Sequence, residues 1–164
     1  MKHILHRLVP TKKDEGVVVL TLSILSPENI LMDQVIQTKE EAIRLTGKLL
    51  VDRGYVQQSY IEKMLEREAL MSTYIGNLVA IPHGTDDGKR EILKSGIVII
   101  QIPNGVDFGD GNIVKLIFGI AGKDGEHLDI LSNIAIVVSD IANVHKIINA
   151  TSVKEVLDFF KEAV

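Results

Sequence analysis

The chain has 164 residues, the length of one ordinary domain, and its 46% hydrophobic and 24% charged residues are typical of a globular protein. It contains no cysteine, which excludes disulfides, cysteine-ligated metal sites and thiol nucleophiles. A formal net charge of −4 and only 4% aromatic residues argue against a surface that binds nucleic acid.

The amino-terminal residues differ in character from the rest. Residues 1–22 are expected to form an arm, a linker or a fusion remnant. Within them, residues 1–16 begin basic, turn mixed in charge and break at Gly16. They lack the long apolar stretch of a signal peptide, and no apolar run of the chain approaches the ~20 residues of a membrane span. We therefore expect cytoplasmic residence, a folded domain over 23–164, and an edge strand from the alternation in Val17–Leu25.

Helix signals follow. Ser26 before a proline predicts a short helical turn. Two capping boxes, each a hydroxyl residue with a glutamate three positions later, predict consecutive helices. The first begins after Thr38 and spans about 39–53; the second begins after Ser59 and spans about 60–71.

The middle of the chain changes to strands. Stretches rich in β-branched residues, bounded by Gly, Pro, Asn or Asp, predict three strands, over 77–81, 94–102 and 113–121. A helical pattern then returns with Asp124 as its candidate cap, and a last amphipathic helix follows Ser152. The mixed order predicts an α/β fold with a central sheet.

His83 has the most informative context of the five histidines. It follows a strand-like stretch, and the adjoining Pro82 and Gly84 turn the chain sharply and leave the flank of the imidazole open. Two interpretations stand: a functional imidazole at a strand end, or a turn histidine bonded to a local carbonyl. His3 and His6 are expected to be solvated residues of the arm, able at most to bind a metal loosely, and His145 to lie exposed on a surface helix.

Two further residues suit a bound phosphoryl group. His127 falls in the first turn of its predicted helix, beside free backbone N–H groups and the positive end of the helix dipole. Arg67 lies near the end of the second helix, and an arginine guanidinium can bind phosphate through two parallel hydrogen bonds. The alternatives are an exposed residue at a helix start for His127 and a solvated ion pair with a neighbouring glutamate for Arg67.

Several ordered blocks around these residues resemble one family. Glu66-Arg67-Glu68, the run from Ser72 to Asn77 and the run from Ala80 to Thr85 resemble the enzyme IIA domain of the bacterial sugar phosphotransferase system, in its type-2 mannitol/fructose subgroup. The blocks Gly105–Gly111 and Gly119–Leu131 extend the resemblance to about residues 26–160. The residues of these blocks are most similar to the mannitol branch of the family.

The resemblance implies a fold, a reaction and site residues. The implied fold is a single domain with a central mixed sheet flanked by helices on both sides. The implied activity is phosphotransfer: phosphorylated HPr gives its phosphoryl group to a histidine, which passes it to a cysteine of the IIB domain while the sugar crosses the membrane through IIC. The phosphorylated histidine falls on His83, the second active-site histidine on His127 and the active-site arginine on Arg67. No cofactor, metal or nucleic acid is implied, and IIC is contacted only indirectly.

Two other functions stay open from the sequence. In the first, the chain is a regulatory module, like nitrogen-type IIA proteins or domains fused to transcription regulators, whose phosphorylated histidine changes which protein it binds. The second is a metal-dependent hydrolase using His83 and His127, which is disfavoured because no third ligand lies at a suitable spacing.

Overall fold

The computed structural model describes residues 25–162. The arm expected over 1–22, with His3 and His6, lies outside the described residues, and so do residues 17–24 of the expected edge strand.

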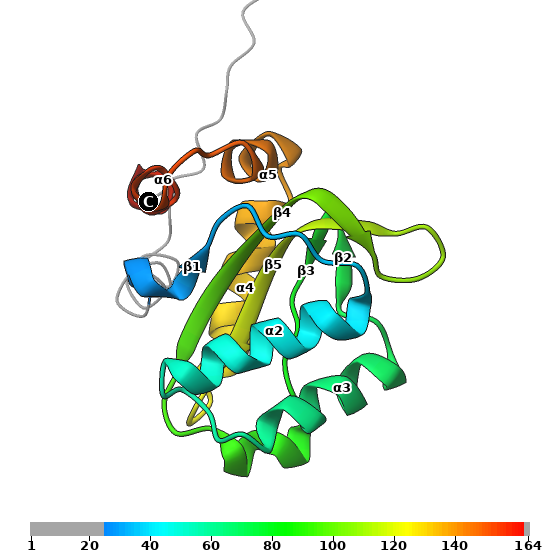
Figure 1. Cartoon of the computed structure of the whole chain (residues 1–164). Helices are drawn as coiled ribbons and strands as arrows, with labels where there is room; N and C mark the ends of the chain where they lie inside the picture. The colour runs from blue at the N-terminus through cyan, green and yellow to red at the C-terminus, as the bar shows by residue number, and fades with distance from the viewer. Residues whose placement is uncertain (1–24, 163–164) are drawn as a thin grey trace, which may run out of the picture.

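Five strands form one sheet, and helices lie between these strands and after them in the sequence. In chain order the elements are the 3₁₀ turn η1 (Pro27–Asn29), β1 (Ile30–Leu31), α2 (Lys39–Asp52), α3 (Tyr60–Leu70), β2 (Tyr74–Gly76), β3 (Val79–Ala80), the 3₁₀ helix η2 (Asp86–Glu91), β4 (Gly96–Asp107), β5 (Ile113–Ala121), α4 (Glu126–Val138), α5 (Ile141–Ile148) and α6 (Val153–Glu162). The strands lie in the order β1-β4-β5-β3-β2 (Figure 1). Because β1–β4 and β3–β5 pair parallel while β4–β5 and β2–β3 pair antiparallel, the sheet is mixed.

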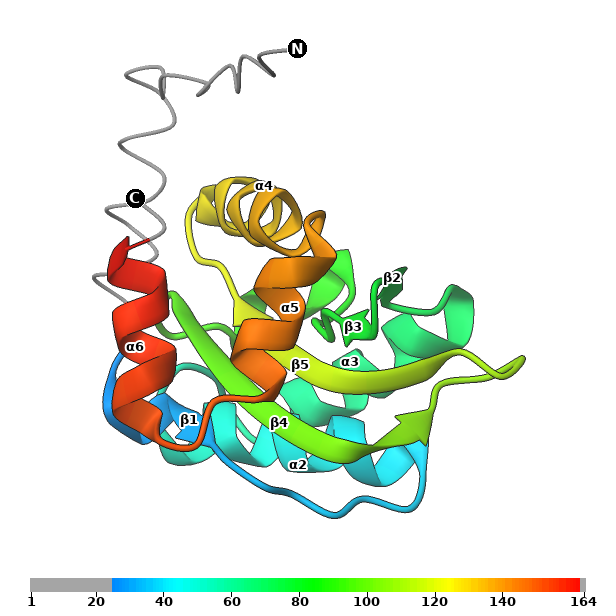
Figure 2. The ribbon, with the colours of Figure 1, turned by 90° about the horizontal axis from the view of Figure 1, so that it is seen from above.

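Helices cover both faces of this sheet. Along β4, Val98 and Ile100 belong to the hydrophobic cluster under α2 and α3, whereas Ile97 and Ile99 belong to the cluster under α4, α5 and α6. This follows from the strand period of two, which sends successive side chains to opposite faces. Figure 2 shows the two layers on either side of the sheet. The expected fold class, a single α/β domain with helices on both faces, is confirmed.

The two capping boxes had different outcomes. Thr38 caps α2, because its Oγ1 accepts a hydrogen bond from the Glu41 N–H at 3.1 Å, although the Glu41 carboxylate accepts from Gln37 instead of Thr38. The box predicted at Ser59 is wrong, even though α3 starts where expected. Ser59 has helical dihedrals and donates its hydroxyl to Glu91 at 2.5 Å, so its oxygen makes no cap bond.

Other boundaries shifted where turns require unusual dihedrals. The strand expected over 77–81 becomes β3 after a tight turn, in which Asn77 and Leu78 have positive φ of 51° and 68°. The strand over 113–121 matches β5, whereas β4 runs beyond residue 102 to Asp107. Asp124 does not cap α4. Its φ is 55°, outside the extended region that a cap residue needs, and Gly125 occupies the cap position.

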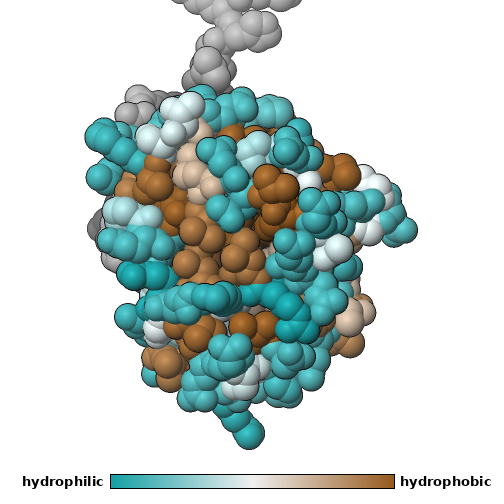
Figure 3. All heavy atoms as spheres, viewed as in Figure 1, coloured by the Kyte–Doolittle hydropathy of each residue, from teal (hydrophilic) through white to brown (hydrophobic). Residues whose placement is uncertain are grey.

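Some apolar surface remains uncovered. Figure 3, seen from the α2 side, shows hydrophobic residues between α2 and the end of the molecule that carries α5 and α6. Within residues 25–162 no single helix is long and apolar enough to span a membrane; α4 and α5 meet that test only together, and they are bent by 93°. His83 follows β3, and His127 lies at the start of α4, after β5.

Candidate active site

The parallel pair β3–β5 brings two separate chain segments to one edge of the sheet. The carboxyl ends of parallel strands meet at the same edge, so the residues that leave β3 and β5 become neighbours. The hydrogen bonding between the two segments continues two residues past β3, since the Ile120 N–H donates to the Pro82 carbonyl at 3.1 Å. His83 therefore lies beside the segment that runs from Ala121 into α4.

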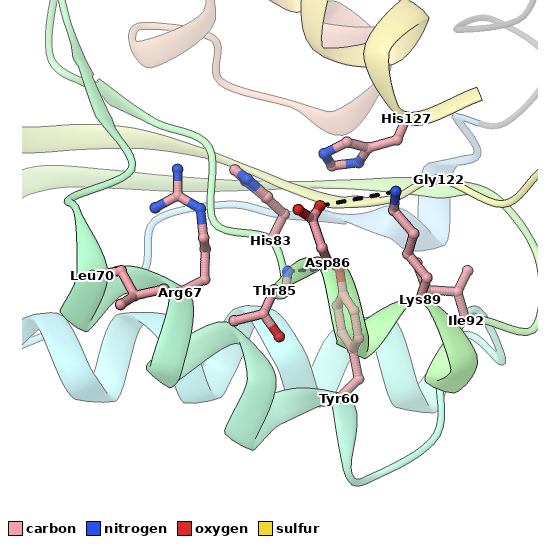
Figure 4. Close-up of a pocket in the computed structure, with 11 residues that line it drawn as sticks. Tyr60, Arg67, Leu70, His83, Thr85, Asp86, Lys89, Ile92, Gly122 and His127 are labelled. Carbon is pink, nitrogen blue, oxygen red and sulfur yellow. Dashed lines mark hydrogen bonds and ion pairs between the residues drawn. The ribbon is translucent and has the colours of Figure 1, made fainter. Parts of the chain in front are cut away.

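His83 and His127 face each other across this edge. Their ring centroids are 5.0 Å apart with an angle of 56° between the planes. His127 is the second residue of α4, in the first turn as the sequence predicts. Both rings line a cavity of about 210 Å³, and Arg67 lines it from α3 (Figure 4). The structure thus brings the three candidate residues together, while His145 lies exposed on α5 and does not line this cavity.

One ring nitrogen of His83 is committed to the backbone. Nδ1 lies 2.7 Å from the Ile81 carbonyl oxygen, and because a carbonyl only accepts, Nδ1 carries the proton of the neutral ring. Nε2 is left with a lone pair. The local carbonyl bond that characterises a turn histidine is therefore present, and the same bond fixes the tautomer that a nucleophilic Nε2 requires.

Both rings are held neutral at physiological pH. Burial lowers the pKa of His83 from its ordinary 6.5; the Ile81 carbonyl opposes this shift, and the charge of Arg67 adds to it. Burial, and then the neighbouring His83 and Lys89, lower the pKa of His127 to about 4. A neutral imidazole keeps its lone pair, so each ring can act as a nucleophile or as a hydrogen-bond donor near pH 7.

Arg67 is held by the backbone and not by a carboxylate. Its Nη1 donates to the Met71 carbonyl at 2.6 Å, across the end of α3. The adjacent Glu66 pairs with Lys63, and Glu68 accepts hydrogen bonds from the chain that follows α3. Among the described residues, no carboxylate lies within ion-pair distance of Arg67, so the solvated-pair interpretation is wrong. The guanidinium charge stays available to the cavity.

Three lining residues were not singled out from the sequence. Lys89 and Asp86 come from η2 and form a 3.8 Å ion pair at the mouth of the cavity, with Asp86 fully exposed. Tyr60, the first residue of α3, lies beneath His83. The polar sequence after the His83 turn is a signal that could have indicated Asp86 and Lys89. Tyr60 has no sequence signal beyond its place at a helix start. With Arg67 and Lys89 against Asp86, the lining charge is positive, which suits an anion.

Known proteins share this architecture and sequence. Residues 23–163 match the family described as "Phosphoenolpyruvate-dependent sugar phosphotransferase system, EIIA 2". The chain is 58% identical over 143 residues to the mannitol-specific phosphotransferase enzyme IIA component of Geobacillus stearothermophilus, covering 87% of this chain and 99% of that protein. The corresponding component of Bacillus subtilis is 53% identical over 141 residues, covering 86% and 99%.

A solved structure agrees with these relatives. The complex of enzyme IIAMTL and phosphorylated enzyme IIBMTL from Escherichia coli contains a chain similar to this one, with a TM-score of 0.80 and 39% identity. The similarity covers 84% of this chain and 97% of that one. The sequence resemblance noted above is therefore confirmed over residues 23–163. The chain belongs to the EIIA type-2 family of the phosphoenolpyruvate-dependent sugar phosphotransferase system.

Proposed function

We propose that this chain is the IIA phosphotransferase component of a mannitol phosphotransferase system, with His83 as its phosphorylated residue. It takes the phosphoryl group from phosphorylated HPr and gives it to a cysteine of the IIB domain, and it meets IIC only indirectly. The observation that carries the proposal is the Nδ1 bond of His83 to the Ile81 carbonyl, beside a cavity that Arg67 and His127 also line. A cytoplasmic location is part of the proposal.

Each transfer exchanges one bond to phosphorus for another. In the first, Nε2 of His83 attacks the phosphorus of phospho-HPr, the P–N bond to HPr breaks, and its histidine leaves with the electron pair. In the second, a cysteine thiolate of IIB attacks, an S–P bond forms, and Nε2 regains its lone pair. The Nδ1 proton stays in place throughout, because its bond to Ile81 stabilises the positive ring that phosphorylation creates.

The remaining groups stabilise charge and position the reacting atoms. Phosphoryl transfer demands little covalent chemistry of the protein, so electrostatic stabilisation and orientation dominate. Arg67 offers a planar cation to the equatorial oxygens. The neutral ring of His127, 5.0 Å from His83 between centroids, can donate a hydrogen bond to the same oxygens without adding a full charge.

Labelling tests the proposal directly. Incubation with phosphorylated HPr is expected to label the wild-type chain and not His83→Ala, while His145→Ala, which removes an exposed histidine outside this cavity, keeps the label. His127→Ala is expected to fold normally and to slow transfer onward to IIB. A labelled His83→Ala chain would refute the assignment. Labelling without transfer to any mannitol IIB would favour the regulatory alternative.

A further inference from the structure

Tyr60 places its hydroxyl between the two chain segments that carry the histidines. Its oxygen accepts a hydrogen bond from the Gly84 N–H at 2.8 Å, and its O–H donates to the Ile120 carbonyl at 3.1 Å. Gly84 directly follows His83, and Ile120 lies near the end of β5. The residue is only 2% exposed, so neither bond is exchanged easily for one with water.

Hydrogen bonds connect both sequence neighbours of His83, Pro82 and Gly84, to Ile120 of β5. The Ile120 N–H donates to the Pro82 carbonyl at 3.1 Å, and the Ile120 carbonyl holds Gly84 through the tyrosine hydroxyl. The ring also packs directly on the turn, since a Cβ on Gly84 would lie 2.5 Å from the Tyr60 Cε2. The backbone on both sides of His83 is therefore anchored to β5, once directly and once through Tyr60.

The same strand seats His127. Two residues after Ile120, Gly122 lies so close to the start of α4 that a Cβ there would be 2.4 Å from the His127 Cα. An anchor on Ile120 consequently sets the His83 turn relative to the segment against which His127 rests. Within the described residues, Tyr60 is the one side chain that hydrogen-bonds both segments.

We propose that Tyr60 is a positioning residue for phosphotransfer, which holds the imidazole of His83 in position relative to the imidazole of His127. The inference rests on the proposed function. Through its one oxygen, the hydroxyl accepts from one segment and donates to the other. Burial raises the pKa of Tyr60 to about 12, so the proton for the second bond is present near neutral pH. Loss of the hydroxyl frees the turn while the ring keeps filling its space.

The test compares two tyrosine hydroxyls in one chain. Tyr60→Phe removes the bridge; Tyr55→Phe is the matched control, because Tyr55 is also buried and its hydroxyl accepts from the Asn29 amide at 2.7 Å, but it does not line the cavity. Both variants are assayed for transfer from phosphorylated HPr at varied HPr concentration. Tyr60→Phe is expected to lower kcat about 10–100-fold with KM changed less than about twofold, since small misplacements of reacting groups cost rates of this order. Tyr55→Phe is expected to keep the wild-type kcat.

The outcomes separate the positioning role of Tyr60 from the proposed function of the chain. A Tyr60→Phe chain with wild-type kcat, or a Tyr55→Phe chain with an equal loss, overturns the positioning role while the proposed function stands. A wild-type chain that takes no label overturns the proposed function, and the role of Tyr60 in transfer with it. Gly84→Ala, which displaces the same turn and keeps the hydroxyl, provides a second variant and is expected to lower kcat as well, with folding checked by circular dichroism.

Discussion

Glu68 offers the sharpest test of how the fold holds Arg67 in place. Its side chain is 4% exposed and its carboxylate accepts hydrogen bonds from the Ser72 hydroxyl at 2.7 Å and from the N–H and hydroxyl of Thr73 at 2.9 and 2.6 Å. These two residues follow Met71, whose carbonyl binds the Arg67 guanidinium. The carboxylate thus fixes the segment that in turn holds the arginine.

The magnitude follows from what Glu68→Gln changes. The amide keeps the shape and one acceptor oxygen, which can still serve both donors of Thr73. It loses the negative charge that strengthens the bonds and that faces Lys39 at 3.7 Å. Because hydrogen bonds to charged groups contribute about 1.5–3 kcal/mol each against roughly 1 for neutral ones, we expect the free energy of unfolding to fall by about 1–3 kcal/mol.

Urea unfolding of two variants on the same helix measures this effect. Glu62→Gln is the control, because the Glu62 side chain is 69% exposed and its ion pair with Arg44 is a surface pair of 3.4 Å. The control is expected to change stability by less than about 0.5 kcal/mol. Glu68→Gln is also expected to slow phosphoryl transfer. Equal stability of the two variants would refute the reasoning that the buried carboxylate organises the end of α3.

Three further predictions concern the histidines and the arginine. In an NMR titration the His127 ring should protonate near pH 4. Because its pKa in the folded chain is lowered from 6.5, the unfolded chain protonates first, so the free energy of unfolding falls as the pH drops from 6.5 towards about 4. A ring that titrates at 6.5 would contradict this. Gly122→Ala would bring a Cβ within 2.4 Å of the His127 Cα, so unfolding experiments should show a loss of about 1–3 kcal/mol; an unchanged midpoint would mean that α4 shifts freely. Arg67→Ala should slow transfer far more than it reduces stability, and Arg67→Lys should restore only part of the rate because lysine lacks the planar fork; full rescue by lysine would show that charge alone matters.

Local sequence signals sufficed for most of the helices and for β5. Thr38 caps α2 and Ser152 precedes α6 as their spacing predicts, because a cap involves atoms only three residues apart. The same logic failed at Ser59, since a residue distant in sequence, Glu91, takes its hydroxyl. A capping pattern states what a side chain can bind and not which competing partner the fold brings near.

For the candidate site, too, the sequence indicated the residues, whereas the fold decided their contacts. His83, His127 and Arg67 could be named from the sequence, because the blocks around them match a family in order. The meeting of the two histidines depends on the parallel pairing of β3 and β5, which no local pattern specifies. The Ile81 carbonyl that fixes the tautomer lies only two residues from His83, yet its use depends on the conformation of the turn.

The chain's own order of residues determined which groups are candidates for the chemistry, since the identity of a nucleophile or a cation is a property of the side chain. Only the tertiary structure decided how these groups behave. Burial of the two rings lowers their pKa values, and the hydroxyl of Tyr60 joins segments 24 and 60 residues away. Desolvation and long-range hydrogen bonds both arise from contacts between segments distant in sequence, and such contacts exist only once the sheet has formed.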